Sequence, residues 1–170
     1  MARATTIPVL GSILCLAVAQ VTYGQAAWKV TSPDGEVAME VRLADPGPVA
    51  DYPAGKARLY YEVQCKGRTV LPLSPLGIAR DDRAFVDGLK FVEARPVIFV
   101  NETYMMLTGK RKVCRNYARE QTLVFFGPDN AKLELVVRAY DDGVAFRYRF
   151  PESSDEKHVV LSEATGFRLP

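Results

Sequence analysis

The sequence contains only one histidine, His158, and this scarcity removes several kinds of catalytic site at once. Zinc sites usually combine several histidines and cysteines, and the HExxH pattern of a zinc-binding helix does not occur in the sequence. A Ser-His-Asp hydrolase would have to use His158, yet the G-x-S-x-G motif that presents such a nucleophile is also missing. The sequence therefore contains no familiar zinc-dependent or serine-based machinery.

A long apolar run is missing as well, because the longest one, residues 7–16, is interrupted by proline, glycine and serine. A helix needs about 20 apolar residues to cross a bilayer comfortably. A basic residue before this run and small residues near Gly24 are typical of an export signal. We therefore interpret residues 1–24 as a signal peptide and residues 25–170 as the exported mature protein. An uncleaved membrane anchor is the alternative.

The charge balance does not indicate any class of binding partner, since the chain has 22 basic and 20 acidic residues. Removal of the signal takes away one basic residue and leaves 21 against 20, a net charge of +1. The densest basic stretch, KRKVCR at residues 110–115, could hold phosphates. Positive side chains also protect strand edges from unwanted pairing, and we prefer that interpretation. We expect no nucleic-acid partner and no membrane contact after signal cleavage.

Cysteine is scarce too, and the mature part contains only Cys65 and Cys114. An oxidising compartment would permit a disulfide between them. Two free thiols that behave as small apolar residues on strands are the other interpretation. The sequence leaves both possibilities open.

Apolar and polar residues alternate with a period of two after Trp28, and no helical stripe of ten residues or more is present. Short strands separated by turns indicate an all-β sandwich or barrel. The segment 71–77 contains two prolines, which cannot donate to a ladder, so it should follow a sheet edge or cross between sheets. The predicted strands cover residues 37–43, 58–65, 68–71, 88–93, 97–100, 104–107, 120–126, 132–140, 144–150 and 157–161.

Two adjacent carboxylates, Asp141 and Asp142, stand in the string RAYDDGVAFRYRF of residues 138–150. A catalytic pair, a calcium loop and a turn are the three interpretations. Asp-Gly between alternating apolar residues is a strong hairpin signal, because glycine tolerates positive φ. A calcium loop needs several more oxygen ligands, and residues 144–146 offer none from their side chains. We therefore interpret the two aspartates as turn formers and predict positive φ at Gly143.

These residues also resemble a known family. The string YDDGVAFRY at 140–148, preceded by LELVVRA and followed by FPE, is similar to the N-terminal domain of glycoside hydrolase family 97. In order and rough spacing the resemblance covers nearly the whole mature chain. It includes SPDG at 32–35, LYYEV at 59–63, SPLG at 74–77, GKR at 109–111, Glu163, Thr165 and Phe167.

The resemblance implies an all-β fold, an antiparallel β-sandwich of the galactose-mutarotase-like kind, also called a supersandwich. In the family this sandwich packs in cis against a separate (β/α) barrel that carries the catalysis. Such a barrel takes at least about 200 residues, so the catalytic barrel is absent from this chain of 170 residues. We expect the sandwich itself to be incomplete at its C-terminus.

The resemblance further implies an exported bacterial, exo-acting α-glycosidase with calcium in its active site. Its substrates would be α-linked glucosides or galactosides, and both inverting and retaining courses remain open. One glutamate ligand of the calcium comes from the sandwich domain, and we expect its position beyond Pro170. We therefore assign no catalytic, cofactor-binding or metal residue here. The chain alone is predicted to be inactive and is not expected to bind calcium fully.

Among the segments that resemble the family, only residues 109–111 suggest a functional role. Their basic side chains could reach a sugar hydroxyl or an acidic group on the barrel. Solvated loop charge is the preferred interpretation. The larger aromatics are interpreted as core or interface residues and not as a sugar platform: Trp28, Tyr60, Tyr61, Tyr104 and Tyr117. Alternative functions are a free-standing exported β-sandwich that binds carbohydrate without hydrolysing it, and a structural or adhesion module that binds only protein.

Overall fold

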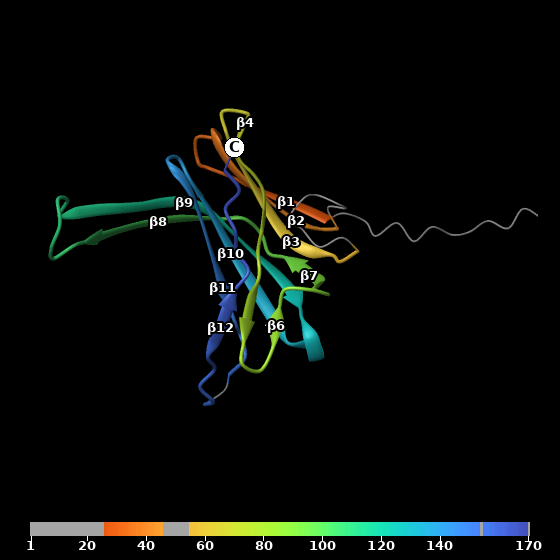
Figure 1. Ribbon diagram of the computed structural model, residues 1–170. Helices are drawn as coiled ribbons and strands as arrows, with labels where there is room; N and C mark the ends of the chain where they lie inside the picture. The colour runs from red at the N-terminus through yellow and green to blue at the C-terminus, as the bar shows by residue number, and fades with distance from the viewer. Residues whose placement is uncertain (1–25, 46–54, 154, 170) are drawn as a thin grey trace, which may run out of the picture.

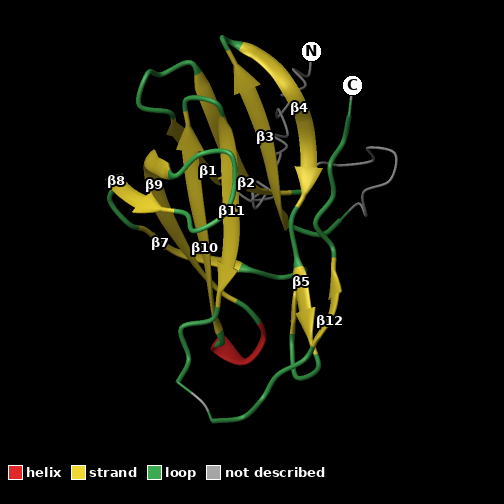
Figure 2. Ribbon diagram, turned by 90° about the vertical axis from the view of Figure 1, so that its left-hand side faces the viewer, coloured by secondary structure: helices red, strands yellow, loops and turns green. Residues whose placement is uncertain are grey.

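A computed structural model describes residues 26–45, 55–153 and 155–169. The signal-peptide interpretation of residues 1–24 lies outside these ranges. The described chain consists of antiparallel strands in three sheets, with a single 3-10 turn at Pro128–Asn130. Figures 1 and 2 show the larger sheets as two packed layers, which confirms the predicted β-sandwich. None of the helical structure within these ranges is long and apolar enough to span a membrane.

Each sheet has a simple neighbour order. The four-stranded sheet consists, in spatial order, of β1 (Ala26–Thr31), β2 (Val37–Ala44), β3 (Arg58–Cys65) and β4 (Arg68–Pro75). The five-stranded sheet has β11 (Gly143–Arg149), β10 (Lys132–Tyr140), β9 (Val113–Phe126) and β7 (Lys90–Ala94), with β8 (Ile98–Met105) also paired to β9. The small sheet has β12 (Val160–Glu163), β5 (Ile78–Arg80) and β6 (Ala84–Phe85).

The core lies between the two larger sheets, because every second residue of their strands points inward. On β10, Leu133, Leu135 and Val137 are completely excluded from water. They belong to the same buried cluster as Met39 of β2 and Tyr61 of β3. The period-two pattern therefore predicted both the strands and the face that each one buries.

The proline-bearing segment takes the edge position that its sequence predicts. β4 is the last strand of its sheet, and the chain after β12 returns to run beside it. Backbone N–H groups of Ala164 and Gly166 donate to the carbonyls of Gly77 and Pro75 at 2.9 and 3.0 Å. The buried Ser74 hydroxyl also accepts from the N–H of residue 168 at 3.0 Å. The edge is thus partly covered.

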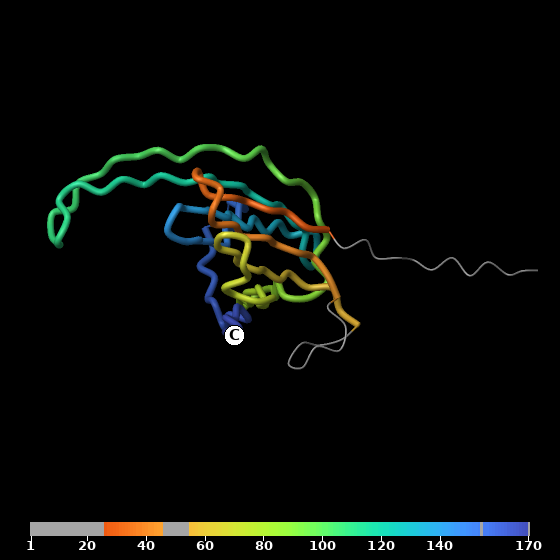
Figure 3. The backbone as a smooth tube through the Cα atoms, turned by 90° about the horizontal axis from the view of Figure 1, so that it is seen from above, coloured from red at the N-terminus to blue at the C-terminus, as the bar shows by residue number. Residues whose placement is uncertain are grey.

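A long ribbon is the main departure from the predicted strands. The sequence predicts separate strands at 97–100 and 104–107 and a short one at 120–126, whereas β8 is continuous and β9 runs for 14 residues. The charged and polar residues of 110–116 hide the alternation, but they are joined across the ribbon. Asn116 Nδ2 donates to Glu102 Oε2 at 2.9 Å, and Arg115 Nε to Asn101 Oδ1 at 3.1 Å. We call residues 98–119 the arm, which projects beyond the sandwich (Figures 1 and 3).

The two predicted hairpin turns differ in backbone conformation. Lys66 and Gly67, between β3 and β4, have φ of 51° and 74°, as a type I′ turn requires. The predicted positive φ at Gly143 is wrong, because the two turn residues are Asp141 and Asp142, and Gly143 is already paired with Tyr140 as the first residue of β11. The pairing places the glycine in the strand, where left-handed backbone is not needed.

Two glycine substitutions should therefore differ although neither site crowds a new Cβ. Gly67→Val should lower the free energy of unfolding by about 1 to 3 kcal/mol, because a β-branched residue is strained at positive φ. Gly143→Val should lower it by no more than about 0.5 kcal/mol, because this half-buried site has room for a new Cβ and its backbone is not left-handed. Urea unfolding of both variants measures the difference, and equal effects would contradict the turn assignment.

Candidate functional site

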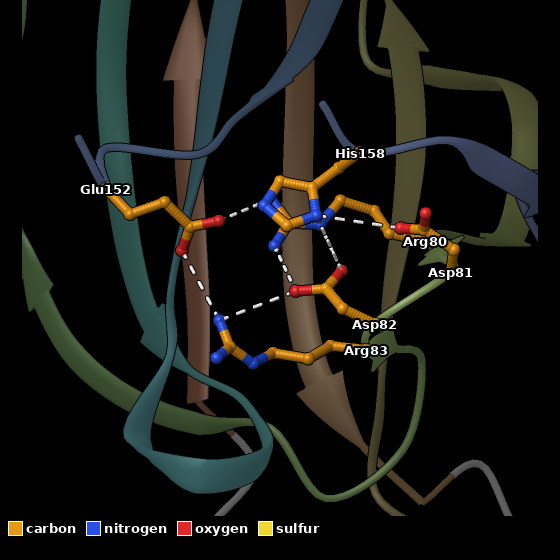
Figure 4. A network of polar contacts seen from close by, with 6 residues as sticks. All are labelled: Arg80, Asp81, Asp82, Arg83, Glu152 and His158. Atoms are coloured by element: carbon orange, nitrogen blue, oxygen red, sulfur yellow. Dashed lines mark hydrogen bonds and ion pairs between the residues drawn. The ribbon is translucent and has the colours of Figure 1, made fainter. Parts of the chain in front are cut away.

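A cluster of charged side chains at the end of the small sheet is the most concentrated polar arrangement in the described chain. Arg80, the last residue of β5, is its centre, and its side chain is only 4% exposed. Its guanidinium contacts Asp82 at 2.7 Å and Glu152 at 2.5 Å (Figure 4). The turn between β5 and β6 positions Asp82, since Arg80 N–H donates to the Arg83 carbonyl at 2.8 Å. Glu152 follows β11.

Two phenyl rings complete the surroundings of Arg80. The guanidinium carbon lies 4.5 Å from the Phe150 ring centre and 5.8 Å from that of Phe85, in cation–π geometry. A planar guanidinium suits this place because it can stack on rings while its N–H groups reach carboxylates in the plane. The hydrogen bond with Asp82, followed by that with Glu152, raises the pKa of Arg80, so its charge is permanent.

On the outer side of the cluster the distances between charged groups are longer than those around Arg80. Arg83 lies 3.7 Å from Asp82 and 3.6 Å from Glu152, and His158 Nδ1 lies 3.6 Å from oxygens of both Asp81 and Asp82 (Figure 4). The backbone is tied here too, because Asp81 N–H donates to the carbonyl of residue 159 at 2.9 Å. The cluster therefore joins three segments that are far apart in sequence: the β5–β6 hairpin, the end of β11 and the approach to β12.

The cluster does not have the chemistry of a catalytic pair. The Arg80 hydrogen bonds lower the pKa of Asp82 to about 2, against an ordinary value of 3.8. A carboxylate this acidic is a weak base near neutral pH and holds no proton to donate. Both Asp82 oxygens already accept from Arg80, at 2.9 and 2.7 Å. The arrangement is suited to holding segments together.

A metal ion also fits poorly. Asp81, Asp82 and His158 each offer one ligand atom within 4.8 Å of the others. Calcium prefers six to eight oxygen ligands, whereas one atom here is an imidazole nitrogen and Asp82 is bound to the guanidinium of Arg80. A neighbouring fixed positive charge would also repel the ion. These residues do not fit calcium, and we assign them no metal role.

Asp141 and Asp142, considered at first as a catalytic pair, lie in the β10–β11 turn. Asp141 Oδ1 accepts from the backbone N–H of Asp34 at 3.0 Å, which ties this turn to the SPDG turn 107 residues earlier. Asp34 in turn accepts from Ser32 Oγ, and this hydrogen bond is the main reason that the pKa of Asp34 is lowered. Asp142 is exposed. Asp141 therefore forms part of the turn and also links it to a distant turn, a contact that the local sequence does not reveal.

The other residues singled out in the sequence are dispersed. Residues 109–111 are exposed at the tip of the arm. Cys65 and Cys114 are both free thiols, on β3 and on the arm. The aromatics divide into two groups: Tyr60, Tyr61 and Trp28 belong to the sandwich interior or its margin, whereas Tyr104 and Tyr117 belong to the arm.

Sequence reasoning missed the Arg80 cluster. Its only local signal is the run Arg80-Asp-Asp-Arg83 between apolar residues 78 and 85. Such a run is also typical of an ordinary polar turn. Glu152 and His158 are more than 65 residues away, and nothing in the local pattern indicates that the fold brings them back.

The fold and the cluster together define an antiparallel β-sandwich domain whose charged side chains hold separate segments of the chain in place. The chain matches the family model described as "Glycosyl-hydrolase 97 N-terminal" over residues 30–170. It therefore belongs to the family of N-terminal domains of glycoside hydrolase family 97, and the resemblance drawn from the sequence is confirmed.

Two curated relatives are retaining α-galactosidases by name. The chain is 34% identical over 145 residues to the "Probable retaining alpha-galactosidase" of Streptomyces bingchenggensis, covering 85% of this chain and 21% of the relative. It is 24% identical over 158 residues to the "Retaining alpha-galactosidase" of Bacteroides thetaiotaomicron, covering 93% and 21%. The chain thus spans about a fifth of the length of these relatives.

Solved structures agree with the fold. A beta-arabinopyranosidase superposes with a TM-score of 0.71 at 27% identity, covering 84% of this chain and 21% of that one. A family 97 enzyme from Pseudoalteromonas sp. strain K8, in complex with acarbose, gives a TM-score of 0.66 at 23% identity, with 84% and 20% covered. At 23% identity, the similarity to the second structure is evidence for a shared fold and for nothing more.

Arg80→Ala should lower the free energy of unfolding by about 3 kcal/mol, because it removes the buried cation that lies closest to both Asp82 and Glu152. Arg83→Ala is the matched control. Its side chain is 33% exposed and its contacts are longer, so we expect a loss of about 1 kcal/mol or less. Urea unfolding compares the two, and a similar small loss from both would contradict the central position of Arg80.

The Asp82 interaction should also appear as a pH dependence of stability. Because the folded-state pKa is about 2 and the ordinary value is 3.8, folding favours the ionised carboxyl. This stabilisation is present above about pH 4 and is lost as the pH falls toward 2. The difference in melting temperature between the wild type and Asp82→Asn should therefore shrink over that range. In an Arg80→Met background the same comparison should be nearly independent of pH.

Proposed function

We propose that this chain is the supporting N-terminal sandwich of an exported, calcium-dependent, exo-acting α-glycosidase whose (β/α) barrel carries the catalysis. The family match over residues 30–170 carries the proposal, together with coverage of only about a fifth of each relative. Charged residues of the Arg80 cluster hold segments of the sandwich together, which is what a supporting domain needs. The reacting carboxylates would then belong to the longer protein.

The relatives indicate the substrate class. Both curated relatives are named as retaining α-galactosidases, so α-galactosides and a retaining course are the first expectation. α-Glucosides come second, since family 97 structures are described in complex with panose and acarbose. In a retaining enzyme the nucleophile and the acid/base carboxyl stand about 5 Å apart. We place both on the barrel.

The proposal of export and the proposal of calcium dependence are based on different observations. Residues 1–24 have the pattern of a signal peptide, and export to a bacterial periplasm or the extracellular space follows from it. Calcium dependence rests on the family resemblance. Because Asp81, Asp82 and His158 do not fit the ion, its ligands would be supplied by other parts of the longer protein.

A second candidate function is carbohydrate binding without hydrolysis. An open cleft of about 590 Å³ lies where the arm meets the β10–β11 turn. Its lining combines aromatic side chains with hydrogen-bonding groups, the residue types that bind small polar ligands. The lining residues are Tyr104, Arg115, Asn116, Tyr140 and Asp142.

Replacement of the matched segment of the Streptomyces α-galactosidase by residues 30–170 of this chain tests the proposal. The chimera should hydrolyse p-nitrophenyl α-galactoside, whereas this chain alone should not. Calorimetric titration of the chain alone with melibiose and maltose tests the second candidate. Heat that is lost in Tyr104→Ala would favour independent sugar binding, and an inactive but folded chimera would count against the supporting role.

A further inference from the structure

The outer half of the arm has no third strand paired to it within the described chain. Residues 113–117 of β9 pair with β8 only, because β10 begins to pair with β9 at Ala118. The ribbon beyond that point extends about 17 Å, at roughly 3.4 Å for each of five residues. Figure 3 shows it reaching well past the sandwich. A two-stranded ribbon is marginally stable alone, so an ordered arm of this length calls for a surface to lie on.

One face of the arm is built from stacked aromatic and arginine side chains. Phe99 stacks on Tyr117 with ring centres 6.5 Å apart. The Arg119 guanidinium lies 5.1 Å from the Phe99 ring and that of Arg115 lies 4.4 Å from Tyr117. The pairing register places these residues on one side, together with Met105. We call this side the ladder face.

The ladder face is apolar as well as cationic, and its outer part is open to solvent, whereas Arg119 at its base donates to Thr31 Oγ1 of β1 at 3.1 Å. Phe99 is 61% exposed, Met105 70% and Val113 59%. Scattered exposed apolar residues need no explanation, but a contiguous set on one projecting element marks an interaction site. Aromatic residues, methionine and arginine are also the types enriched where protein surfaces meet.

Charge indicates the character of the partner. Residues 98–119 contain five basic residues and one acidic residue, a net charge of +4, while the rest of the chain carries −2. The acidic residue, Glu102, lies on the opposite face and bonds to Asn116. The ladder face therefore presents only positive charge. Two copies meeting through this face would repel each other, whereas an acidic protein surface with apolar patches would match it.

We propose that the ladder face is the docking surface for an acidic patch on the domain that follows this sandwich in longer proteins of the family. This inference rests on the proposed supporting function. It adds which element makes the contact, which side of it is used and which charge the partner carries. Met105 and Val113 would lie in the dry centre of the contact, and the lysines of the tip would form its rim.

The test compares this chain alone with the chimera carrying the remainder of the Streptomyces α-galactosidase. Hydroxyl-radical oxidation of Met105, read by mass spectrometry, should be at least tenfold slower in the chimera. Arg115→Glu in the chimera should restore oxidation toward the rate of the isolated chain. Glu102→Lys, a charge reversal on the opposite face of the same ribbon, is the matched control and should leave Met105 protected.

Oxidation of Met105 at the same rate in both proteins would overturn the proposal. Concentration-dependent protection in the isolated chain would show a second copy on this face, and protection by added heparin would show an anionic polysaccharide. Either result would also overturn it. Hydrolysis of p-nitrophenyl α-galactoside is measured on the same samples. An active chimera with an unprotected arm contradicts only this inference, whereas a protected arm in an inactive chimera contradicts the supporting function.

Discussion

The pairing of β10 along both of its edges is the constraint on which the rest of the structure depends. Its inward side chains, Leu133, Leu135 and Val137, are fully buried against the opposite sheet, and each contributes about 1.5 to 3 kcal/mol. A shift of one residue would turn all of them toward solvent, so the register is fixed. β10 thereby sets the position of β9, whose extra length becomes the arm. It also sets β11, whose end brings Phe150 and Glu152 to Arg80.

The charged residues fall into two groups with different physical roles. Around Arg80, whose own side chain is almost fully buried, they form ion pairs with one another, so they fix the path of the chain into and out of the small sheet. On the arm five of the six charged residues are basic, and two of its arginines lie against aromatic rings. The first group holds the domain together, while the second faces outward.

Much of the sandwich could be predicted from the sequence, because period-two alternation reports directly which side of a strand is buried. The edge position of β4 followed from its prolines, and the turn at Lys66-Gly67 from its glycine. The arm was predicted only in part: the two ends of β8 were expected as strands, but the polar residues of 110–116 hid the start of β9 and the continuous ribbon. Gly143 was wrongly placed in the turn, because the sequence does not show whether the two turn residues are 141–142 or 142–143. The Arg80 cluster depends on Glu152, which only the folded topology brings near.

We propose that this sandwich works as part of a longer glycosidase. The most direct test is the intact mass of the native protein, captured from its source cells with antibodies against residues 30–170 and measured by mass spectrometry. Relatives of which this chain spans 21% predict a mass about five times the 18.8 kDa of the chain. A native mass at or slightly below 18.8 kDa would contradict the account and favour an independent carbohydrate-binding protein.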